Sequence, residues 1–262
     1  MDTITLTTAT GINLFALFST VLWYSLRVGA MLQVLPFVGG RGIPLRARLL
    51  LILVLSAMMA SFLPAPPAAT VSALTTLSVL RELAIGAAIG LMIRLAFEAG
   101  NLAGQFISQD MALSFATMTD PANQSSMSVV SLWFFITFGL MFFTLDAHLA
   151  LISLVADSYR AVPIGVALPD TQAFLARVPE FVPVILRASV LISLPVTVAL
   201  LSVHIIVGVL ARAAPQLNPI QIGMPVALLM GLFLLAALAQ ELLGPIRALF
   251  MEAFQAARAV TG

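Results

Sequence analysis

Cysteine and lysine are absent from this 262-residue sequence, histidine occurs twice, and charged residues of either sign are scarce. Without cysteine, the chain can form neither disulfide bonds nor cysteine-ligated metal sites. The two histidines, His148 and His204, do not form the paired motif that zinc enzymes use. The net charge is only +1, which gives no reason to expect a nucleic-acid partner.

Motifs of the common enzyme classes are also missing. The sequence contains no G-x-S-x-G nucleophile elbow, no Walker A motif and no Rossmann fingerprint. We therefore expect a protein that is not an enzyme and that holds neither a cofactor nor a metal ion.

Long apolar runs dominate what is present. Apolar residues make up 61% of the chain and charged residues 9%, whereas about 25% of a soluble domain is charged. A helix needs roughly 20 apolar residues to cross a bilayer. Runs of this kind predict helices near residues 13–37, 47–63, 70–108, 127–157, 184–211 and 222–254. The sequence thus predicts an all-α membrane protein, with the polar stretch 158–183 as a connector.

The arginines do not orient these helices. Cytoplasmic loops of membrane proteins collect basic residues, but the arginines here divide almost evenly between the two sides, whichever end of the chain lies inside. Either one helix is broken or re-entrant, or other protein subunits rather than lipid surround the apolar helices. We favour the second explanation.

Glycines mark one face of the third apolar run. They follow a rhythm of four, three and four residues with Ile93 and Phe97, and they are Gly86, Gly90, Gly100 and Gly104. Glycine on a shared helical face lets another backbone approach closely. We expect ordinary helix packing there, with a dedicated contact to another subunit as the alternative.

A polar stripe runs beside the glycines. Its members are spaced four, three, four and four residues apart, and they are Arg94, Glu98, Asn101, Gln105 and Gln109. Polar side chains are costly in a bilayer unless they face water or a partner. Either this helix lines an aqueous path, or Arg94 and Glu98 form a simple pair where the helix emerges into water.

Other charges stand alone in apolar runs. Arg27 and Arg187 are expected to extend toward the membrane interface. Arg81 and Glu82 are adjacent, so each is expected to meet a different helix or subunit. Asp146 is two residues from His148, and residues so spaced do not face each other on a helix. We therefore expect a helix break near Asp146 and not a proton relay.

Four stretches resemble, in order, the FliR/SctT-like family of type III secretion export-gate subunits. They are RVGAMLQVLPFVGGRGIPLRAR (27–48), ELAIGAAIGLMIRLAFEAGNLAGQFISQDMALSFATMTDP (82–121), HLALISLVADSYRAVPIG (148–165) and PQLNPIQIGMPVALLMG (215–231). The last contains the residues identified as the family signature, which are Pro215, Gln216, Leu217, Asn218, Gly223 and Pro225. The stretches 64–73, 166–183 and 245–262 match no motif of the family.

The resemblance implies a core subunit of the flagellar type III export gate. Such a chain joins FliP-like and FliQ-like subunits as helical hairpins in a helical, pseudo-hexameric assembly, whose pore passes unfolded export substrates. It implies a FliP-like portion at about 1–180 and a FliQ-like portion at 181–262. FlhB-like and FlhA-like components and membrane lipid are further expected partners. The expected location is the bacterial inner membrane at the flagellar basal body.

The family also suggests a role for QDMALSFATMTDPANQSSMS (109–128), the polar segment between the third and fourth runs. In the family the segment after the glycine-rich helix enters the pore and helps to close it. Carried onto this chain, this plug runs from about Gln109 to Gln124. Gly104 and Gln105 are expected at its root. The expected plug and pore residues are Gln105, Gln109, Asp110, Met111, Phe115, Met118, Asp120 and Pro121. A plain hydrophilic loop is the simpler alternative, and a small-solute secondary transporter is the alternative function.

Overall fold

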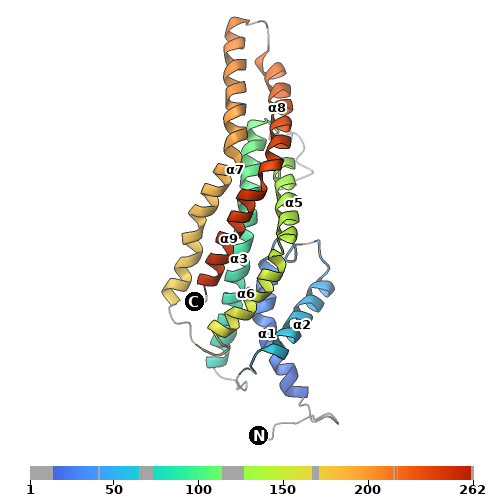
Figure 1. The fold of residues 1–262 in the computed structure, drawn as a ribbon, viewed down its shortest axis with the longest axis vertical. Helices are drawn as coiled ribbons and strands as arrows, with labels where there is room; N and C mark the ends of the chain where they lie inside the picture. The colour runs from blue at the N-terminus through green and yellow to red at the C-terminus, as the bar shows by residue number, and fades with distance from the viewer. Residues whose placement is uncertain are drawn as a thin grey trace. The chain divides into compact units, whose positions relative to one another are not determined.

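The computed structural model describes residues 14–40, 42–64, 66, 73–113, 127–166, 171–214, 216 and 218–260. Within these residues the regular secondary structure consists of α-helices alone (Figure 1), as the sequence predicts. They are α1 (Leu14–Val34), α2 (Leu45–Phe62), α3 (Ala73–Asp110), α5 (Val129–Thr144), α6 (Ala147–Ala161), α7 (Thr171–Ala213), α8 (Pro219–Glu241) and α9 (Leu243–Ala259).

Five of these helices are long and apolar enough to cross a membrane. They are α1, α2, α3, α7 and α8, and the bent pair α5 and α6 makes a sixth span if it is counted as one. The six runs predicted from the sequence therefore correspond to helical segments of the fold.

The chain divides into two compact units. Unit 1 comprises Met1–Arg94, His148–Phe181 and Glu252–Gly262, and unit 2 comprises Leu95–Ala147 and Val182–Met251. The helices α3, α7 and α9 are divided between the two units, and α6 belongs to unit 1 except for its first residue, Ala147. Each unit has its own buried core.

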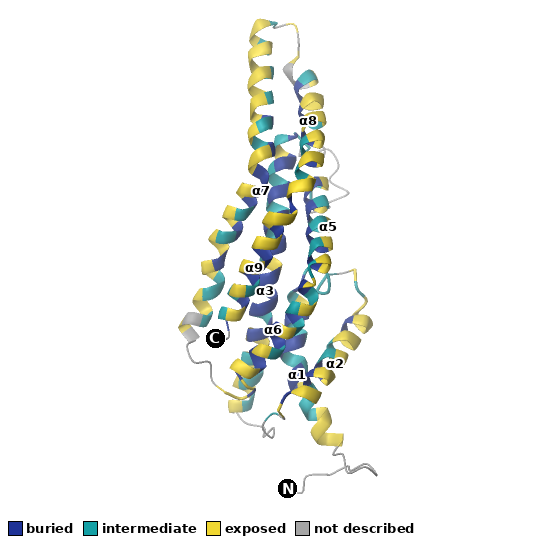
Figure 2. Ribbon diagram, in the orientation of Figure 1, coloured by how far each residue is buried: buried dark blue, intermediate teal, exposed yellow. Residues whose placement is uncertain are grey.

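The core of unit 1 forms where α1 and α6 bury side chains together with the first half of α3. Val28 and Met31 of α1 are buried, and so are Ile85 and Ile89 of α3. Each helix thus buries residues three or four positions apart, as expected for one face of a helix. Figure 2 shows α3 as largely buried and α2 as largely exposed.

The core of unit 2 holds a cluster of phenylalanines. The ring centroid of Phe97 in α3 lies 5.3 Å from that of Phe250 in α9 and 5.7 Å from that of Phe142 in α5. The rings of Phe142 and Phe250 lie 5.5 Å apart. Such edge and tilted contacts add a specific attraction to the burial of the rings, so this cluster joins three helices distant in sequence.

The fourth predicted run is broken where the sequence led us to expect it. Helices α5 and α6 meet at a bend of 69°, and Asp146 stands between them with a φ of 53°. Its backbone N–H donates to the carbonyl of Phe143 at 3.2 Å. Aspartate is one of the few residues that adopt this left-handed conformation readily, so the predicted break is confirmed.

The connector predicted at 158–183 is wrong in its second half, because α7 already begins at Thr171. Phe181 and Ile185 are buried, and they continue the spacing of the partly buried Phe174 and Val178. This is the pattern of an amphipathic helix. The charged residues that suggested a connector lie on its accessible side.

The last predicted run, 222–254, is also divided. Helix α8 ends at Glu241 and α9 begins at Leu243. Pro245 stands in the first turn of α9, where proline is tolerated because the N–H that it lacks would be unpaired there. A continuous helix would place the same proline in an interior turn, where it removes a hydrogen bond.

Candidate functional site

The third helix ends in a defined cap just where the polar segment begins. The N–H of Leu113 donates to the carbonyl of Ser108, and the N–H of Ala112 donates to that of Gln109, both at 3.0 Å. This is the Schellman arrangement, in which the residue after the helix is left-handed and usually glycine. Here the position is held by Ala112 with a φ of 60°. An L-residue in this conformation costs roughly 1–2 kcal/mol.

Met111 fixes this cap to α8. Its side chain is 2% exposed. A Cβ placed on Gly231 would lie 2.5 Å from Cγ of Met111 and 2.7 Å from its Sδ. The side chain of Met111 thus lies in the space directly over Gly231, so the root of the polar segment is packed into unit 2.

The far end of the polar segment is capped as well. The hydroxyl oxygen of Ser128 accepts the backbone N–H of Ser131 at 3.0 Å, which is the usual N-terminal cap of a helix. The hydroxyl of Ser131 donates to the carbonyl of Asn101 at 3.0 Å. The start of α5 is thereby tied to α3.

The four glycines of α3 allow other helices of the same chain to pack closely against it. A Cβ on Gly86 would collide with the carbonyl oxygen of Arg27, and one on Gly90 would lie 2.6 Å from that of Met31. These two glycines admit the backbone of α1. A Cβ on Gly100 would lie 2.7 Å from the ring of Phe138, and one on Gly104 would lie 2.5 Å from Cα of Ser131. These two admit α5.

The polar stripe lies on the more accessible side of α3. Arg94 and Gln109 are exposed, and three residues between them are partly buried, namely Glu98, Asn101 and Gln105. The side-chain amide of Asn101 donates to Oε2 of Glu98 at 2.9 Å. Helix α3 therefore presents glycines toward its own neighbours and polar groups toward the outside.

A cavity of about 230 Å³ adjoins the root of the polar segment. Its lining includes Gln109 and Asp110 of α3 and Ser193 and Thr197 of α7. Oδ2 of Asp110 and Oγ1 of Thr197 are buried without a hydrogen-bond partner among the described residues. A cavity of this size can admit water, and these two oxygens are groups to which such a water could bind at the last turn of α3.

Of the predicted plug residues, the structure places four. Gln105 and Gln109 belong to the polar stripe, Asp110 borders the cavity, and Met111 is packed against α8. The other four, Phe115, Met118, Asp120 and Pro121, lie outside the described residues. The structure thus defines the two anchors of the polar segment, at Ser108–Leu113 and at Met127–Ser131. That the segment between them enters a pore stays a prediction.

A buried ion pair in unit 1 was not anticipated. Arg27 is fully buried, so the prediction that it extends toward the membrane interface is wrong. Its Nε lies 2.9 Å from Oε2 of Glu82, and its Nη2 lies 3.1 Å from Oε1. The guanidinium also donates to Oγ of Ser158 at 3.0 Å and to the carbonyl of Val162 at 2.9 Å. These contacts join α1, α3 and α6.

The position of this pair follows from the glycine crossing. Gly86 lies one turn after Glu82 and against the backbone of Arg27, so the close approach of α1 brings the two charges together. Glu82 does meet another helix, as predicted. Two opposite charges in separate apolar runs, one of them a turn away from a packing glycine, are the sequence signal that could have predicted the pair.

The predicted signature residues surround the turn between α7 and α8. Gln216 and Asn218 precede α8, and the carbonyl of Asn218 accepts the N–H of Ile222 at 3.3 Å. Gly223 and Pro225 lie in the first turns of α8, and a Cβ on Gly223 would lie 3.1 Å from Val207 of α7. Pro215 and Leu217 lie outside the described residues. In the part of the chain that is described, no three acidic or histidine side chains cluster as a metal site.

Comparisons with known proteins agree with this architecture. The family described as bacterial export proteins, family 1, matches residues 18–253. The flagellar biosynthetic protein FliR of Escherichia coli (strain K12) is 35% identical over 233 residues, which is 88% of each chain. FliR of Pectobacterium carotovorum subsp. carotovorum is 32% identical over 84% of each chain. FliR of Buchnera aphidicola subsp. Acyrthosiphon pisum is 31% identical over 87% of this chain and 88% of the relative.

These matches confirm the family that four separate stretches of sequence resemble. The family match reaches from within α1 to within α9 and so includes all or part of every described helix. With its helices of membrane-spanning length, the chain is an integral membrane component of the flagellar export apparatus. It belongs to family 1 of the bacterial export proteins, the family of FliR.

Proposed function

We propose that this chain is a core subunit of the flagellar type III export gate and that, with FliP-like and FliQ-like subunits, it forms the channel for unfolded export substrates. FlhB-like and FlhA-like components are its further partners, and the complex belongs to the inner membrane at the flagellar basal body. The chain contributes structure and a closing segment, and not catalysis. Residues 1–180 are proposed as its FliP-like portion and 181–262 as its FliQ-like portion.

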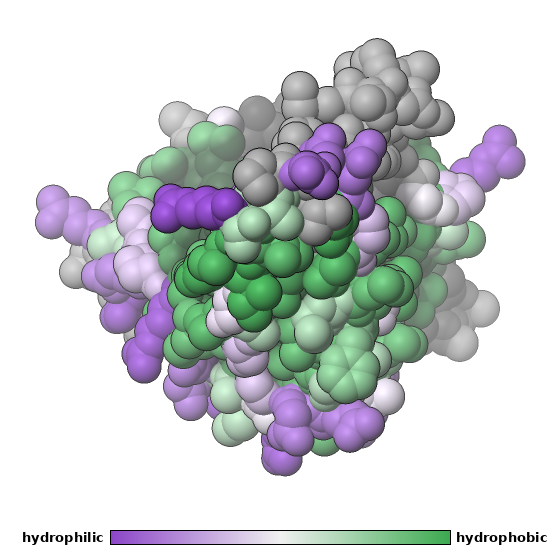
Figure 3. Space-filling model, turned by 90° about the horizontal axis from the view of Figure 1, so that it is seen from above, coloured by the Kyte–Doolittle hydropathy of each residue, from purple (hydrophilic) through white to green (hydrophobic). Residues whose placement is uncertain are grey.

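The observation that carries this proposal is the exposure of the most apolar helices. In the apolar 18-residue stretches that make α7 and α8 candidate spans, only 22% of the residues are buried within the chain. Large exposed side chains line both helices, and they include Leu201, Ile205, Ile206, Val209, Leu229, Leu232 and Phe233. In the view of Figure 3, hydrophobic residues form a broad surface with hydrophilic residues at its margins.

Partner subunits are the better cover for this surface. Lipid alone could also cover apolar helices, but a chain surrounded by lipid normally gathers its basic residues on one side. If each of the six predicted runs crosses the membrane once, the arginines here do not follow that rule. Protein neighbours remove the constraint, because helices buried against protein need not be oriented by the bilayer.

The closing role of the polar segment is supported by how its ends are held. The capped end of α3 and the capped start of α5 are anchored in unit 2 by Met111 and Ser128. Residues 114–126 connect these anchors, and we propose that residues up to about Gln124 enter the pore. The accessible polar stripe of α3 is proposed to line the path that leads to them.

Copurification tests the proposal. The chain would carry an affinity tag and be coexpressed with FliP-like and FliQ-like subunits from the same genome. We expect both to copurify in detergent as one heteromeric particle several times the mass of this chain. A tagged chain that purifies without them, and that alone transports a labelled small solute, would support the secondary transporter instead.

A further inference from the structure

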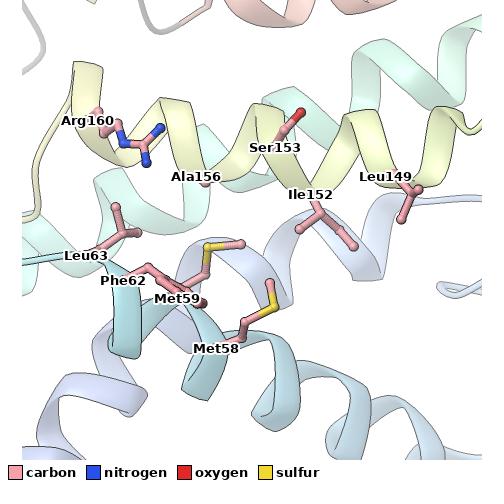
Figure 4. Close-up of a pocket in the computed structure, with 9 residues that line it drawn as sticks. All are labelled: Met58, Met59, Phe62, Leu63, Leu149, Ile152, Ser153, Ala156 and Arg160. Atoms are coloured by element: carbon pink, nitrogen blue, oxygen red, sulfur yellow. The ribbon is translucent and has the colours of Figure 1, made fainter.

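A groove on unit 1 runs between α2 and α6. It has a volume of about 410 Å³. Figure 4 shows Leu149 and Ile152 of α6 pointing toward α2, with Met58 and Met59 of α2 on the opposite wall. The hydroxyl of Ser153 donates to the carbonyl of Ala150 in its own helix at 2.8 Å, so it adds little polarity. Apart from one end, the groove is apolar.

The length of the groove suits an extended chain. Its lining on α6 extends from Leu149 to Arg160, about 16 Å at the rise of an α-helix. An extended hydrocarbon chain is about as wide as a carbon–carbon contact of about 4 Å, and a groove of about 410 Å³ has room for one. The groove can therefore hold an acyl chain along its length.

The polar end of the groove lies at Arg160. Figure 4 shows its guanidinium at the end of the groove near Leu63. A second cavity, of about 350 Å³, shares Arg160 and adds the side chains of Tyr24 and Tyr159. Nη1 of Arg160 donates to Oδ1 of Asp157 at 2.8 Å, and both side chains are well exposed. A guanidinium has five N–H donors, so it can bind a further anion at the same time.

We propose that this groove binds a phospholipid, with one acyl chain between α2 and α6 and the phosphate on Arg160. The bilayer already solvates acyl chains, so the groove alone gives little selectivity. Charge-assisted hydrogen bonds from a guanidinium to phosphate are strong, and they make the headgroup the selective part. The site is independent of whether the chain forms a channel.

Photocrosslinking tests the site in membranes that contain the full-length chain with its coexpressed partners. The probe is phosphatidylglycerol with a diazirine on one acyl chain, and diacylglycerol with the same diazirine chain serves as the phosphate-free comparison. We expect phosphatidylglycerol to label peptides of α2 and α6 at least about five-fold more than diacylglycerol. Equal labelling by the two lipids, or labelling of neither helix, would overturn the proposal.

Three variants separate the two halves of the site. Arg160→Gln should remove the preference for phosphatidylglycerol, and Ala156→Trp should fill the groove and abolish labelling by both lipids. Arg177→Gln is the matched control, since Arg177 also pairs with an acidic residue three positions away, Glu180 at 4.0 Å, but does not line the groove. Unchanged labelling of Arg160→Gln, or labelling of Ala156→Trp at the original level, would contradict the assignment.

Discussion

The side chain of Met111 occupies the space that a side chain at position 231 would need, so that the end of α3 is packed directly on α8. Met111 is also the residue next to the strained Ala112. One contact therefore anchors the root of the polar segment to the helix that carries Gly223 and Pro225 of the family signature. The length and flexibility of methionine suit it to this irregular gap.

Gly231→Leu should displace Met111 and destabilise the chain by about 1–3 kcal/mol, the usual cost of overpacking a core. Gly231→Ala should cost much less, because the methionine can move. Thermal unfolding in detergent, followed by tryptophan fluorescence, measures both. Gly208→Leu is the control, since a Cβ there meets nothing within 4 Å. Equal effects of the substitutions at 231 and 208 would refute the Met111 contact.

Gly104→Ala should destabilise the chain more than Gly231→Ala, although both add one methyl group. At position 104 the new methyl group would clash with backbone atoms of Val130 and Ser131, which cannot move without shifting α5. The loss of stability should appear in the purified chain alone, before any partner is added. A variant that is stable alone but fails to copurify with partner subunits would show that Gly104 serves an intersubunit contact instead.

Ala112→Gly should stabilise the cap of α3 by roughly 1 kcal/mol, because glycine adopts the left-handed conformation without strain. The unfolding temperature of the purified chain should rise by a few degrees. Ala84→Gly, at an exposed position within the same helix, should lower stability by a similar amount. A destabilising Ala112→Gly would contradict the left-handed cap.

Glu82→Ala should destabilise the chain by about 3–5 kcal/mol, because it leaves the charge of Arg27 buried without its partner. The double variant Arg27→Met with Glu82→Leu should recover much of this loss. Asp157→Asn breaks an exposed pair with Arg160 and should cost less than about 1 kcal/mol. If Glu82→Ala and Asp157→Asn had the same unfolding temperature, the buried pair of Arg27 and Glu82 would not contribute to stability as expected.

Local patterns predicted the elements whose causes are local. The spacing of glycines marked the packing face of α3, and Asp146 beside a run of apolar residues marked the break between α5 and α6. The start of α7 was missed because charges such as Arg177 suggested a connector. The apolar spacing of Phe174, Val178 and Phe181 was the better guide.

Contacts between distant parts of the chain were not predicted from the sequence. Arg27 and Glu82 are 55 positions apart, and their pairing depends on how α1 crosses α3. The cap at Ala112 lacks the glycine that normally signals it. The contact of Met111 with Gly231 joins helices whose proximity no local pattern encodes.

Ion conductance tests most directly whether the chain is an export-gate subunit whose polar segment closes the pore. Complexes with FliP-like and FliQ-like subunits would be reconstituted into planar bilayers, with and without residues 114–124 of this chain, which leaves the anchors at Met111 and Ser128 in place. A deletion within residues 67–72 is the control. We predict that only the complex lacking 114–124 conducts ions, although both variants keep the subunit composition of the original. An intact complex that stays closed without these residues would contradict the account.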